Sequence, residues 1–450
     1  MDWLLDRFRN APQGSIAFVH LGRRISYAAL AAHTAQSIER LQARGLGGGL
    51  TVALVADYSP EVFSTILALA VLKCIVVPLT RDSVVEESQA LAISGCDHML
   101  QFDAEGRDWS LQTRHLPANN ALMDGFRAGQ HAGLVLFSSG STGAPKGMLH
   151  DFERVADKFR VARQPVVAIP FLMLDHFGGI NTLLAITASL GTVVTTPNRA
   201  VATVCEAIAA NRVQLLPTTP SFLTLLAATD GSRRYDLSSL QRITYGTETM
   251  PQATLDRIRA RFPGVELQQT YGLSEVGVLR SQSRPDGSLW VRIGGAGFET
   301  EVRDGILWIR SDYRMVGYLN APSGFDAAGW FNTQDRVEVD GDYFRILGRI
   351  TDLINVGGQK VYPAEVEDVI LAQPNIDDVV VVGEKHALLG QIVVARVVLH
   401  EPEAADALRL RLRKACLARL AAFKVPVKVE LLDPALDPAL YSVRFKKMRR

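Results

Sequence analysis

The chain of 450 residues is long enough for up to about three structural units, or for one large α/β domain with a smaller companion. Apolar residues make up 48% and charged residues 21%, which is typical of a globular protein and excludes a disordered chain, a collagen or a polytopic membrane protein. The 48 Lys and Arg against 47 Asp and Glu give a formal net charge of +1, so the chain has no overall attraction to nucleic acid or anionic membranes. An anionic ligand must therefore be held by a local site.

Neither the cysteines nor the N-terminus indicates an exported or membrane-spanning protein. Cys74, Cys96, Cys205 and Cys416 lie far apart without a C-x-x-C pair or a His at metal-ligand spacing, which predicts buried thiols in a reducing compartment. The first ten residues carry acids where a signal peptide has a basic start. The apolar run 62–79 contains a lysine and a proline, so it is predicted as a helix followed by a buried strand. We expect a cytoplasmic protein without a membrane span.

The N-terminal half alternates stretches of helical period with short runs of β-branched residues, which predicts βαβ units and a parallel sheet. The same rhythm returns further along the chain and predicts a second wound sheet. The predicted helices cover 26–45, 61–73, 202–212 and 253–262, and the predicted strands cover 51–56, 74–79, 213–220 and 241–246.

Between residues 280 and 350 the pattern changes to short strands separated by Gly and Asp turns, which predicts antiparallel hairpins. A boundary is predicted at 348–352, and the residues beyond it contain two helices and two strands in a small α+β unit. The predicted fold class is α/β. A large N-terminal domain, residues 1–348, has wound parallel-sheet lobes and a small β-barrel-like part, and a C-terminal α+β domain follows at 349–450.

The first segment with chemical information is LVLFSSGSTGAPKGML, residues 134–149. An apolar strand leads into a turn whose amides and hydroxyls, together with Lys146, can converge on phosphate oxygens. Pro145 stands where a Walker A loop needs glycine, so this is a different kind of phosphate loop. A Ser- and Gly-rich turn alone is also typical of a plain loop, and the lysine and the strand before it favour the phosphate site. The turn contains Ser138, Ser139, Gly140, Ser141, Thr142 and Gly143.

Two further segments suit a nucleotide, although each alone also fits an ordinary turn or a surface ion pair. In YGLSE, the ring of Tyr271 could stack on a base, Ser274 could approach a phosphate and Glu275 could bind Mg²⁺. In GWFNTQDRVEVDGDYFRILGRITD, Asp335 could accept hydrogen bonds from both ribose hydroxyls, and Arg349 could add a charge-assisted bond.

Taken in order, these segments resemble the acyl-adenylate-forming superfamily, which contains acyl-CoA synthetases, adenylation domains of peptide synthetases and beetle luciferases. The ordered set is a Ser/Thr/Gly-PKG loop, YGxSE, an acid after W-F-x-T, GRxxDxI and a lysine near the C-terminus. The resemblance implies an enzyme that makes acyl-AMP and pyrophosphate from a carboxylic acid and ATP, and then forms a thioester with CoA. It implies ATP and Mg²⁺ as cofactors, CoA or a carrier-protein phosphopantetheine as acceptor, and no nucleic-acid partner.

The resemblance also implies roles for individual residues. Ser138 through Lys146 would hold the β- and γ-phosphates, Glu275 would bind Mg²⁺, and His176 would stand at the mouth of the acyl pocket as a further catalytic residue. The nucleotide would also be bound by Gly246, Thr247, Glu248, Tyr271, Gly272, Ser274, Asp335 and Arg349. The acyl pocket, suited to an aryl or medium-length alkyl acid, would be lined by Phe171, Asp175, Thr219, Phe222 and Tyr245.

In the C-terminal part, the resemblance implies a mobile domain that turns on a hinge at Thr351 and Asp352. Gly357 and Gly358 would line a thiol tunnel, and Lys446 would be the catalytic lysine.

The sequence departs from the family pattern at three places. Gln334 replaces the glycine of T-G-D, Thr351 replaces the usual Asp or Lys of the hinge, and Phe445 replaces the glycine before the terminal lysine. Lys447 is therefore a second candidate for the catalytic lysine. Two other functions stay open: a stand-alone enzyme that loads a carrier protein or forms an amide, and a nucleotide-binding regulator without turnover.

Overall fold

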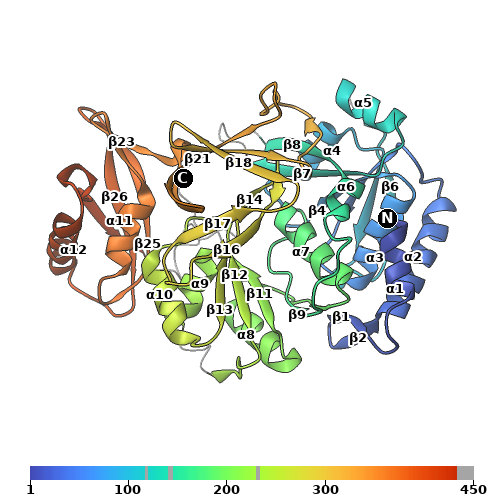
Figure 1. Cartoon of the computed structure of the whole chain (residues 1–450), viewed down its shortest axis with the longest axis horizontal. Coiled ribbons are helices and arrows are strands. Elements are labelled where there is room, and N and C mark those ends of the chain that lie inside the picture. The colour runs from blue at the N-terminus through green and yellow to red at the C-terminus, as the bar shows by residue number, and fades with distance from the viewer. Residues whose placement is uncertain (117–119, 140–144, 230–233, 433–450) are drawn as a thin grey trace.

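The structure of the chain, a computed structural model, describes residues 1–116, 120–139, 145–229 and 234–432 (Figure 1). Ser26 and Ser59 each accept a hydrogen bond from a backbone amide of the helix that follows, so both predicted helices of the N-terminal lobe begin at a capping serine. The α-helices are α1 (Asp2–Arg9), α2 (Tyr27–Gln42), α3 (Pro60–Val71), α4 (Glu87–Ser94), α5 (Ala121–Ala128), α6 (Phe152–Asp157), α7 (Phe177–Ala188), α8 (Val201–Asn211), α9 (Pro220–Ala228), α10 (Gln252–Arg261), α11 (Pro363–Leu371) and α12 (Ala405–Arg419).

Two seven-stranded, mainly parallel sheets form the N-terminal part, which confirms the predicted wound lobes. Sheet I contains, in spatial order, β13 (Glu266–Gln269), β12 (Arg242–Tyr245), β11 (Leu215–Thr218), β9 (Val167–Ala168), β10 (Thr192–Val194), β1 (Ile16–His20) and β2 (Arg23–Ser26). Sheet II contains β20 (Gly317–Tyr318), β8 (Pro145–Asp151), β7 (Gly133–Ser139), β4 (Ile75–Leu79), β3 (Thr51–Val55), β5 (His98–Phe102) and β6 (Trp109–Thr113). The four central strands of sheet II run parallel, and its outer strands are antiparallel.

Helices cover both faces of both sheets, and three buried clusters fill the space between these layers. The largest cluster lies between the two sheets and includes side chains of α1, α2, α3 and α7. A second cluster packs α8, α9 and α10 against the other face of sheet I. A third packs α4 and α5 against the outer face of sheet II. Every helix of the predicted alternation therefore buries an apolar face against a sheet.

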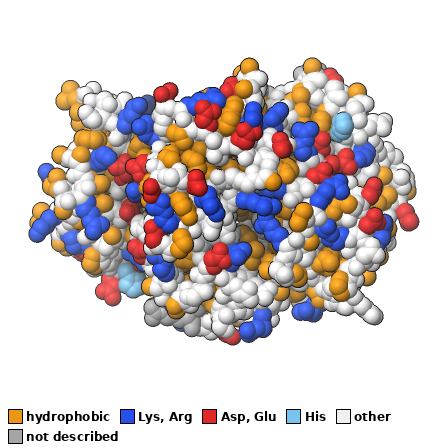
Figure 2. All heavy atoms as spheres, viewed as in Figure 1, with side chains coloured by type: hydrophobic (Ala, Val, Ile, Leu, Met, Phe, Trp, Pro, Cys, Tyr) orange, Lys and Arg blue, Asp and Glu red, His pale blue; other side chains and the backbone are white. Residues whose placement is uncertain are grey.

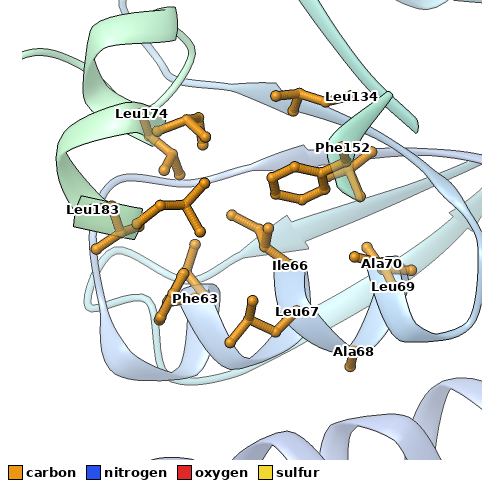
Figure 3. Close-up of a cluster of buried hydrophobic side chains, with 14 of the residues drawn as sticks. Phe63, Ile66, Leu67, Ala68, Leu69, Ala70, Leu134, Phe152, Leu174 and Leu183 are labelled. Carbon is orange, nitrogen blue, oxygen red and sulfur yellow. The ribbon is translucent and has the colours of Figure 1, made fainter. Parts of the chain in front are cut away.

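Figure 3 shows part of the largest cluster, in which α3 supplies most of the side chains. Phe63 and Ile66 of this helix lie beside Phe152 of α6 and Leu183 of α7, and all four are at most 2% exposed. The apolar run 62–79 thus divides into helix α3 and the buried strand β4, as predicted. Among the described residues, no helix has the length and apolar character needed to cross a membrane.

Apart from β20, the strands within residues 280–349 form sheet III, an antiparallel sheet of six strands at the place of the predicted barrel-like part. Its order is β16 (Arg280–Ser283), β17 (Trp290–Gly294), β22 (Tyr343–Arg349), β21 (Phe331–Asp340), β19 (Ile306–Ser311) and β18 (Phe298–Arg303). A short hairpin, β14 (Gly272–Leu273) and β15 (Gly277–Val278), precedes it. Within the described pairing, β16 and β18 each have one neighbour, so the sheet is open.

The C-terminal part, orange and red in Figure 1, forms sheet IV with α11 and α12 packed against it. The sheet contains β24 (Gln359–Val361), β23 (Ile354–Val356), β26 (Gly390–Leu399), β25 (Ile376–His386) and β27 (Lys428–Leu431). Arg257 of α10 donates to the carbonyls of Leu371 and Ile376, and the amide of Ala253 donates to Asp368 at 3.0 Å, so this part docks on α10. The domain boundary at 348/349 falls at the end of β22 and stays a prediction.

The cores bury the four cysteine thiols and the imidazole of His150. The four cysteines are free thiols and fully buried, as predicted, and burial raises the pKa of Cys74 to about 12. His150 of β8 is also fully buried, its ring lies 5.1 Å from that of Phe177, and neither ring nitrogen has a hydrogen-bond partner among the described residues. Burial lowers the pKa of His150 to about 3, because a charged imidazolium would lose its hydration without gaining a partner.

The first prediction concerns the cluster between the two sheets. Phe63→Ala should lower the free energy of unfolding by about 3–5 kcal/mol, because it removes a ring that is 2% exposed and leaves a cavity. Urea denaturation followed by circular dichroism measures this loss. The control Leu388→Ala, at a residue that is 89% exposed, should change the value by less than about 0.5 kcal/mol. Equal effects of the two substitutions would contradict the assignment of this core.

The second prediction concerns His150. The unfolded chain takes up a proton on this ring near pH 6.5, whereas the folded chain does so only near pH 3, so His150 should make the protein lose stability as the pH falls below about 6.5. His150→Leu should therefore reduce the loss of stability between about pH 7.5 and about pH 5, as measured by urea midpoints. The exposed His131→Gln is the control and should leave that difference unchanged. A His150→Leu protein as acid-sensitive as wild type would exclude this residue as the source.

Candidate active site

A cavity of about 760 Å³ opens between α7, the strands β11 to β13 of sheet I, and the segment from β14 to β16. Residues from every predicted nucleotide motif line it, although they come from five separate stretches of chain. The predicted site residues that line the cavity are Ser138, Lys146, His176, Gly246, Thr247, Tyr271, Gly272, Ser274, Glu275, Arg349 and Thr351.

The turn after β12 brings backbone to the cavity at Gly246 and Thr247. A Cβ atom at Gly246 would lie 2.4 Å from the Thr270 hydroxyl oxygen, so only glycine permits this approach of the two strand ends. Glu248 does not line the cavity: its carboxylate accepts hydrogen bonds from the amide and the hydroxyl of Ser221, at 3.0 and 2.6 Å, at the start of α9. Glu248 thereby fixes the turn that carries Gly246. The negative charge of its carboxylate is favourable at the N-terminus of α9, where the helix dipole is positive.

Tyr271, Asp335 and Arg349 form a buried network at one wall of the cavity. The Tyr271 hydroxyl donates to Asp335, whose other carboxylate oxygen accepts from Nε of Arg349 at 3.1 Å. Asp335 is 6% exposed and lies behind Tyr271 and Arg349 rather than in the cavity wall. Burial raises the pKa of Tyr271, and the Asp335 charge raises it further, so the phenol stays a hydrogen-bond donor.

Gln334 lies next to this network in the left-handed region, with φ of 60°. The backbone there has the conformation that the glycine of the family pattern adopts without cost, and a glutamine adopts it at a cost of about 1 kcal/mol. The backbone amide of Gln334 donates to the side-chain oxygen of Asn332 at 2.9 Å, and Gln334 lines the cavity. Glutamine in place of glycine at position 334 therefore changes the side chain that faces the ligand, whereas the backbone conformation of the turn is unchanged.

Lys146 and Glu275 meet at Tyr318, a cavity residue that the sequence analysis did not identify. The Tyr318 hydroxyl donates to Glu275 at 2.7 Å, and the Lys146 ammonium lies 5.3 Å from the centre of the Tyr318 ring. Tyr318 reaches this place because β20 pairs with β8, the strand that begins beside Lys146. Asn320 holds the same strand, because its side chain bonds both Gly147 and Pro145. The short segment around Tyr318 carries no motif that would have indicated this role.

The charge of the cavity is strongly unbalanced. Of its described lining residues, Glu275 is the one carboxylate, and the basic ones are Lys146, Lys158, Arg163, Arg242, Arg280 and Arg349. Among the described residues no group of three His, Cys, Asp or Glu side chains could hold a metal alone. One carboxylate facing a polyphosphate does suit Mg²⁺, which commonly binds through one or two carboxylates and the phosphate oxygens of the substrate. Glu275 therefore fits the predicted role, and the unbalanced cavity suits a polyanion.

His176 is the residue before α7, and its Nδ1 accepts a hydrogen bond from the Gly178 amide at 3.0 Å. The bond fixes the ring at the cavity wall. A Cβ atom at Gly179 would lie 2.0 Å from the carbonyl oxygen of Met173, which explains the paired glycines that follow His176.

The residues predicted for the acyl pocket do not line this cavity. Phe171, Phe222 and Tyr245 are at most 1% exposed and belong to the cluster on the far face of sheet I. Thr219 begins α9, where it accepts from the Phe222 amide, and Asp175 accepts from Ser83 at 2.6 Å. Side chains alternate along a strand, so Tyr245 points away from the cavity and its neighbour Thr244 points into it.

The remaining predicted residues lie outside the cavity or outside the described residues. Asp352 accepts from the Thr351 hydroxyl at 3.4 Å in the short 3-10 helix Ile350–Asp352 that leaves sheet III. Gly357 and Gly358 form the two-residue turn of the β23–β24 hairpin, both at positive φ, and do not line the cavity. Ser139 ends β7. Gly140, Ser141, Thr142, Gly143, Lys446 and Lys447 lie outside the described residues.

Comparisons with known proteins agree with this geometry. The family profile "AMP-binding enzyme" matches residues 5–319, and the profile "AMP-binding enzyme C-terminal domain" matches residues 365–437. The chain is 28% identical to the indoleacetate–CoA ligase of Aromatoleum aromaticum, over 100% of this chain and 97% of that protein. It is 29% identical to a feruloyl-CoA synthase of an Amycolatopsis species, over 96% and 94% of the two chains.

Among solved structures, the anthranilate CoA ligase AuaEII in complex with anthranoyl-AMP has the same fold, with a TM-score of 0.81. The sequence identity is 19%, and the match covers 95% of this chain and 92% of that one. The profile match to most of the chain confirms the resemblance seen in its motifs, and the chain belongs to the AMP-binding enzyme family of adenylate-forming enzymes.

Proposed function

We propose that this enzyme activates a carboxylic acid with ATP, releases pyrophosphate, and passes the acyl group from the acyl-AMP to the thiol of CoA. The observation that carries the proposal is the single cavity in which Ser138 and Lys146, the YGLSE segment and Arg349 come together. The curated relatives that span nearly the whole chain bear the names of CoA ligases, which supports CoA as the acceptor.

In the first step, the carboxylate oxygen of the acid attacks the α-phosphorus of ATP, and the bond to the bridging oxygen of pyrophosphate breaks. An anion approaches a polyanion, so neutralising charge matters more than transferring protons. Lys146, which lines the cavity, would neutralise the leaving pyrophosphate. Glu275 would hold Mg²⁺, which supplies further positive charge to the phosphates, and Tyr318 orients that carboxylate.

The adenosine would lie on the wall formed by Gly246, Thr247 and Tyr271. Arg349 lines the cavity, and its bond to Asp335 holds its side chain in place. It could therefore donate to the ribose or to the α-phosphate with little loss of conformational entropy. Asp335 already accepts hydrogen bonds from Tyr271 and Arg349. To contact the ribose as proposed, its carboxylate oxygens would also accept hydrogen bonds from the ribose hydroxyls.

The second step is proposed to use the C-terminal part, with residues 1–348 and 349–450 acting as two domains. Thr351 and Asp352 would be the hinge between them. The hairpin turn at Gly357 and Gly358 is exposed and would approach the cavity when the smaller domain turns, leaving room for a pantetheine arm. Lys446 would serve the adenylation step.

The third prediction tests the first step. Acid-dependent exchange of labelled pyrophosphate into ATP should be measurable across a set of aryl, alkyl and amino acids. Lys146→Ala should lower the exchange rate by about 10²–10³-fold, because one preorganised charge contact with the leaving group is lost. Lys385→Ala, at an exposed lysine of β25, is the matched control and should exchange at the wild-type rate. No exchange with any acid would refute adenylation and favour a regulator that only binds nucleotide.

The fourth prediction separates the two steps. Lys446→Ala should suppress adenylate formation and spare thioester synthesis from supplied acyl-AMP, because the lysine would contact the phosphates of ATP and not the thiol. Product formation in each half-reaction, followed by chromatography, measures this. Lys447→Ala is the matched variant. Equal loss of both half-reactions in Lys446→Ala, or loss of neither, would transfer the role to Lys447.

The acceptor is tested with the same preferred acid. Incubation with ATP, the acid and CoA should yield acyl-CoA. Accumulation of acyl-AMP without acyl-CoA would count against CoA, and titration with a phosphopantetheinylated carrier protein or an amine would then identify the acceptor.

A further inference from the structure

The cavity continues past the nucleotide residues along the face of sheet I. Gly246 and Thr270 lie at the carboxyl ends of β12 and β13, whereas Arg242 and Leu215 lie at the opposite ends of β12 and β11, and all four line the cavity. Gly246 follows Arg242 by four positions along the strand, which is about 13 Å. Along α7, the advance of nine positions from His176 to Ala185 gives about the same length. The end of the cavity remote from the nucleotide is therefore long enough for a substituted ring or a medium chain.

Basic residues gather at this remote end. Lys158 follows α6, Arg163 lies in the loop before β9, and Arg280 begins β16, so three separate segments each contribute one cation. Burial lowers the pKa of Lys158, and the nearby positive charges of Arg163 and Arg280 lower it further, to about 7. Figure 2 shows basic side chains gathered near the centre of the visible face, over the position of α7 in Figure 1.

These cations lack acidic partners. Among the described residues, Arg163 and Arg280 form no side-chain hydrogen bond or salt bridge, whereas Arg242 at the same end is paired with Glu266 at 2.8 Å. Lys158 is half-buried and donates only to neutral oxygens, the side chain of Asn181 at 3.1 Å and the carbonyl of Val278. Its ammonium also lies within 6 Å of the rings of Phe159 and Phe298. The ring contacts are favourable, whereas the partial burial of the ammonium next to two guanidinium groups has a cost that an anion would relieve.

We propose that the acid activated by this enzyme carries a second carboxylate, at the end remote from the carboxyl that is adenylated, and that Lys158, Arg163 and Arg280 bind it. This inference rests on the proposed function, because it assigns the acyl substrate to the same cavity. The substrate class is then an aryl or medium-chain dicarboxylic acid. It narrows the aryl or medium-length alkyl acid expected from the sequence by adding a second carboxylate, which the basic lining of the cavity favours.

The arrangement also explains which carboxyl reacts. Both ends of a dicarboxylic acid could attack ATP, and the remote cations hold one end away from the α-phosphate. Guanidinium groups suit this task because they pair with carboxylates through two parallel hydrogen bonds. Lys158, which is less exposed than the two arginines, lines the same cavity and adds a third basic group.

The fifth prediction compares acids that share a skeleton and differ in the remote group: terephthalate with benzoate, p-carboxycinnamate with cinnamate, and suberate with octanoate. In pyrophosphate exchange, kcat/KM should be at least about tenfold higher for the dicarboxylate of the best pair. Arg280→Gln and Arg163→Gln should each lower this ratio by about tenfold, because each removes one charge-assisted contact. Arg292→Gln, on the exposed side of β17 and outside the cavity wall, is the matched control and should keep the wild-type ratio.

A charge reversal strengthens the test. Arg280→Glu should shift the preference from the dicarboxylate toward the matching acid with a remote amine, an outcome that a misfolded protein cannot give. Exchange that proceeds equally well with both members of each pair, in wild type and variants, would overturn the inference and leave the proposed function intact. A rise in KM for CoA without a change in the acid ratio would also overturn it, by assigning the arginines to the phosphates of CoA. Absence of exchange with every acid would instead refute the proposed function.

Discussion

The alternation of side chains along β11, β12 and β13 is the constraint on which both the core and the site depend. One face of these strands, which includes Leu216, Ile243 and Tyr245, is mainly apolar and packs against α8, α9 and α10, so the strands cannot shift by one residue without exposing that face. The other face, with Pro217, Thr244 and Gln268, is thereby fixed as the wall of the cavity. The carboxyl ends of the same strands carry the turn at Gly246 and the segment that begins at Tyr271. Packing on one side of the sheet thus sets the position of the ligand on the other.

The basic side chains that line the cavity determine which ligands it can bind. Near the nucleotide residues, the cations have partners that fix their orientation: Arg349 is anchored by Asp335, and Lys146 lies over the ring of Tyr318. A preorganised charge of this kind costs little reorganisation when the substrate binds. At the remote end, Lys158, Arg163 and Arg280 have no acidic partner among the described residues, whereas Arg242 is paired with Glu266. The cavity therefore contains one group of cations with fixed partners and one group without acidic partners. The two groups imply two anionic regions in the bound substrates.

The sequence was sufficient for the family and the wound sheets, because these depend on contiguous motifs and on local periodicity. The predicted helices and strands around α2, α3, β3 and β4 are present. The residues of YGLSE line the cavity, and their contacts with a nucleotide stay a prediction. The sequence did not indicate which residues of β12 line the cavity, because Tyr245 and Thr244 are neighbours in sequence and point to opposite faces of the sheet. Tyr318, Lys158 and Arg280 could not be found, since strand pairing and loop closure bring them to the cavity from segments without a motif.

The remote cations also connect stability with function. The half-buried Lys158, with a pKa of about 7, reduces the stability of the ligand-free protein, since the unfolded chain would keep its ammonium fully hydrated. A protein retains such a cost where a bound group offsets it, and strongly shifted ionisation in a cavity is typical of functional sites. The neutral oxygens of Asn181 and Val278 hold the ammonium in place without neutralising it. The site therefore keeps its charge available for an anion that arrives with the substrate, which an internal salt bridge to an acid would prevent.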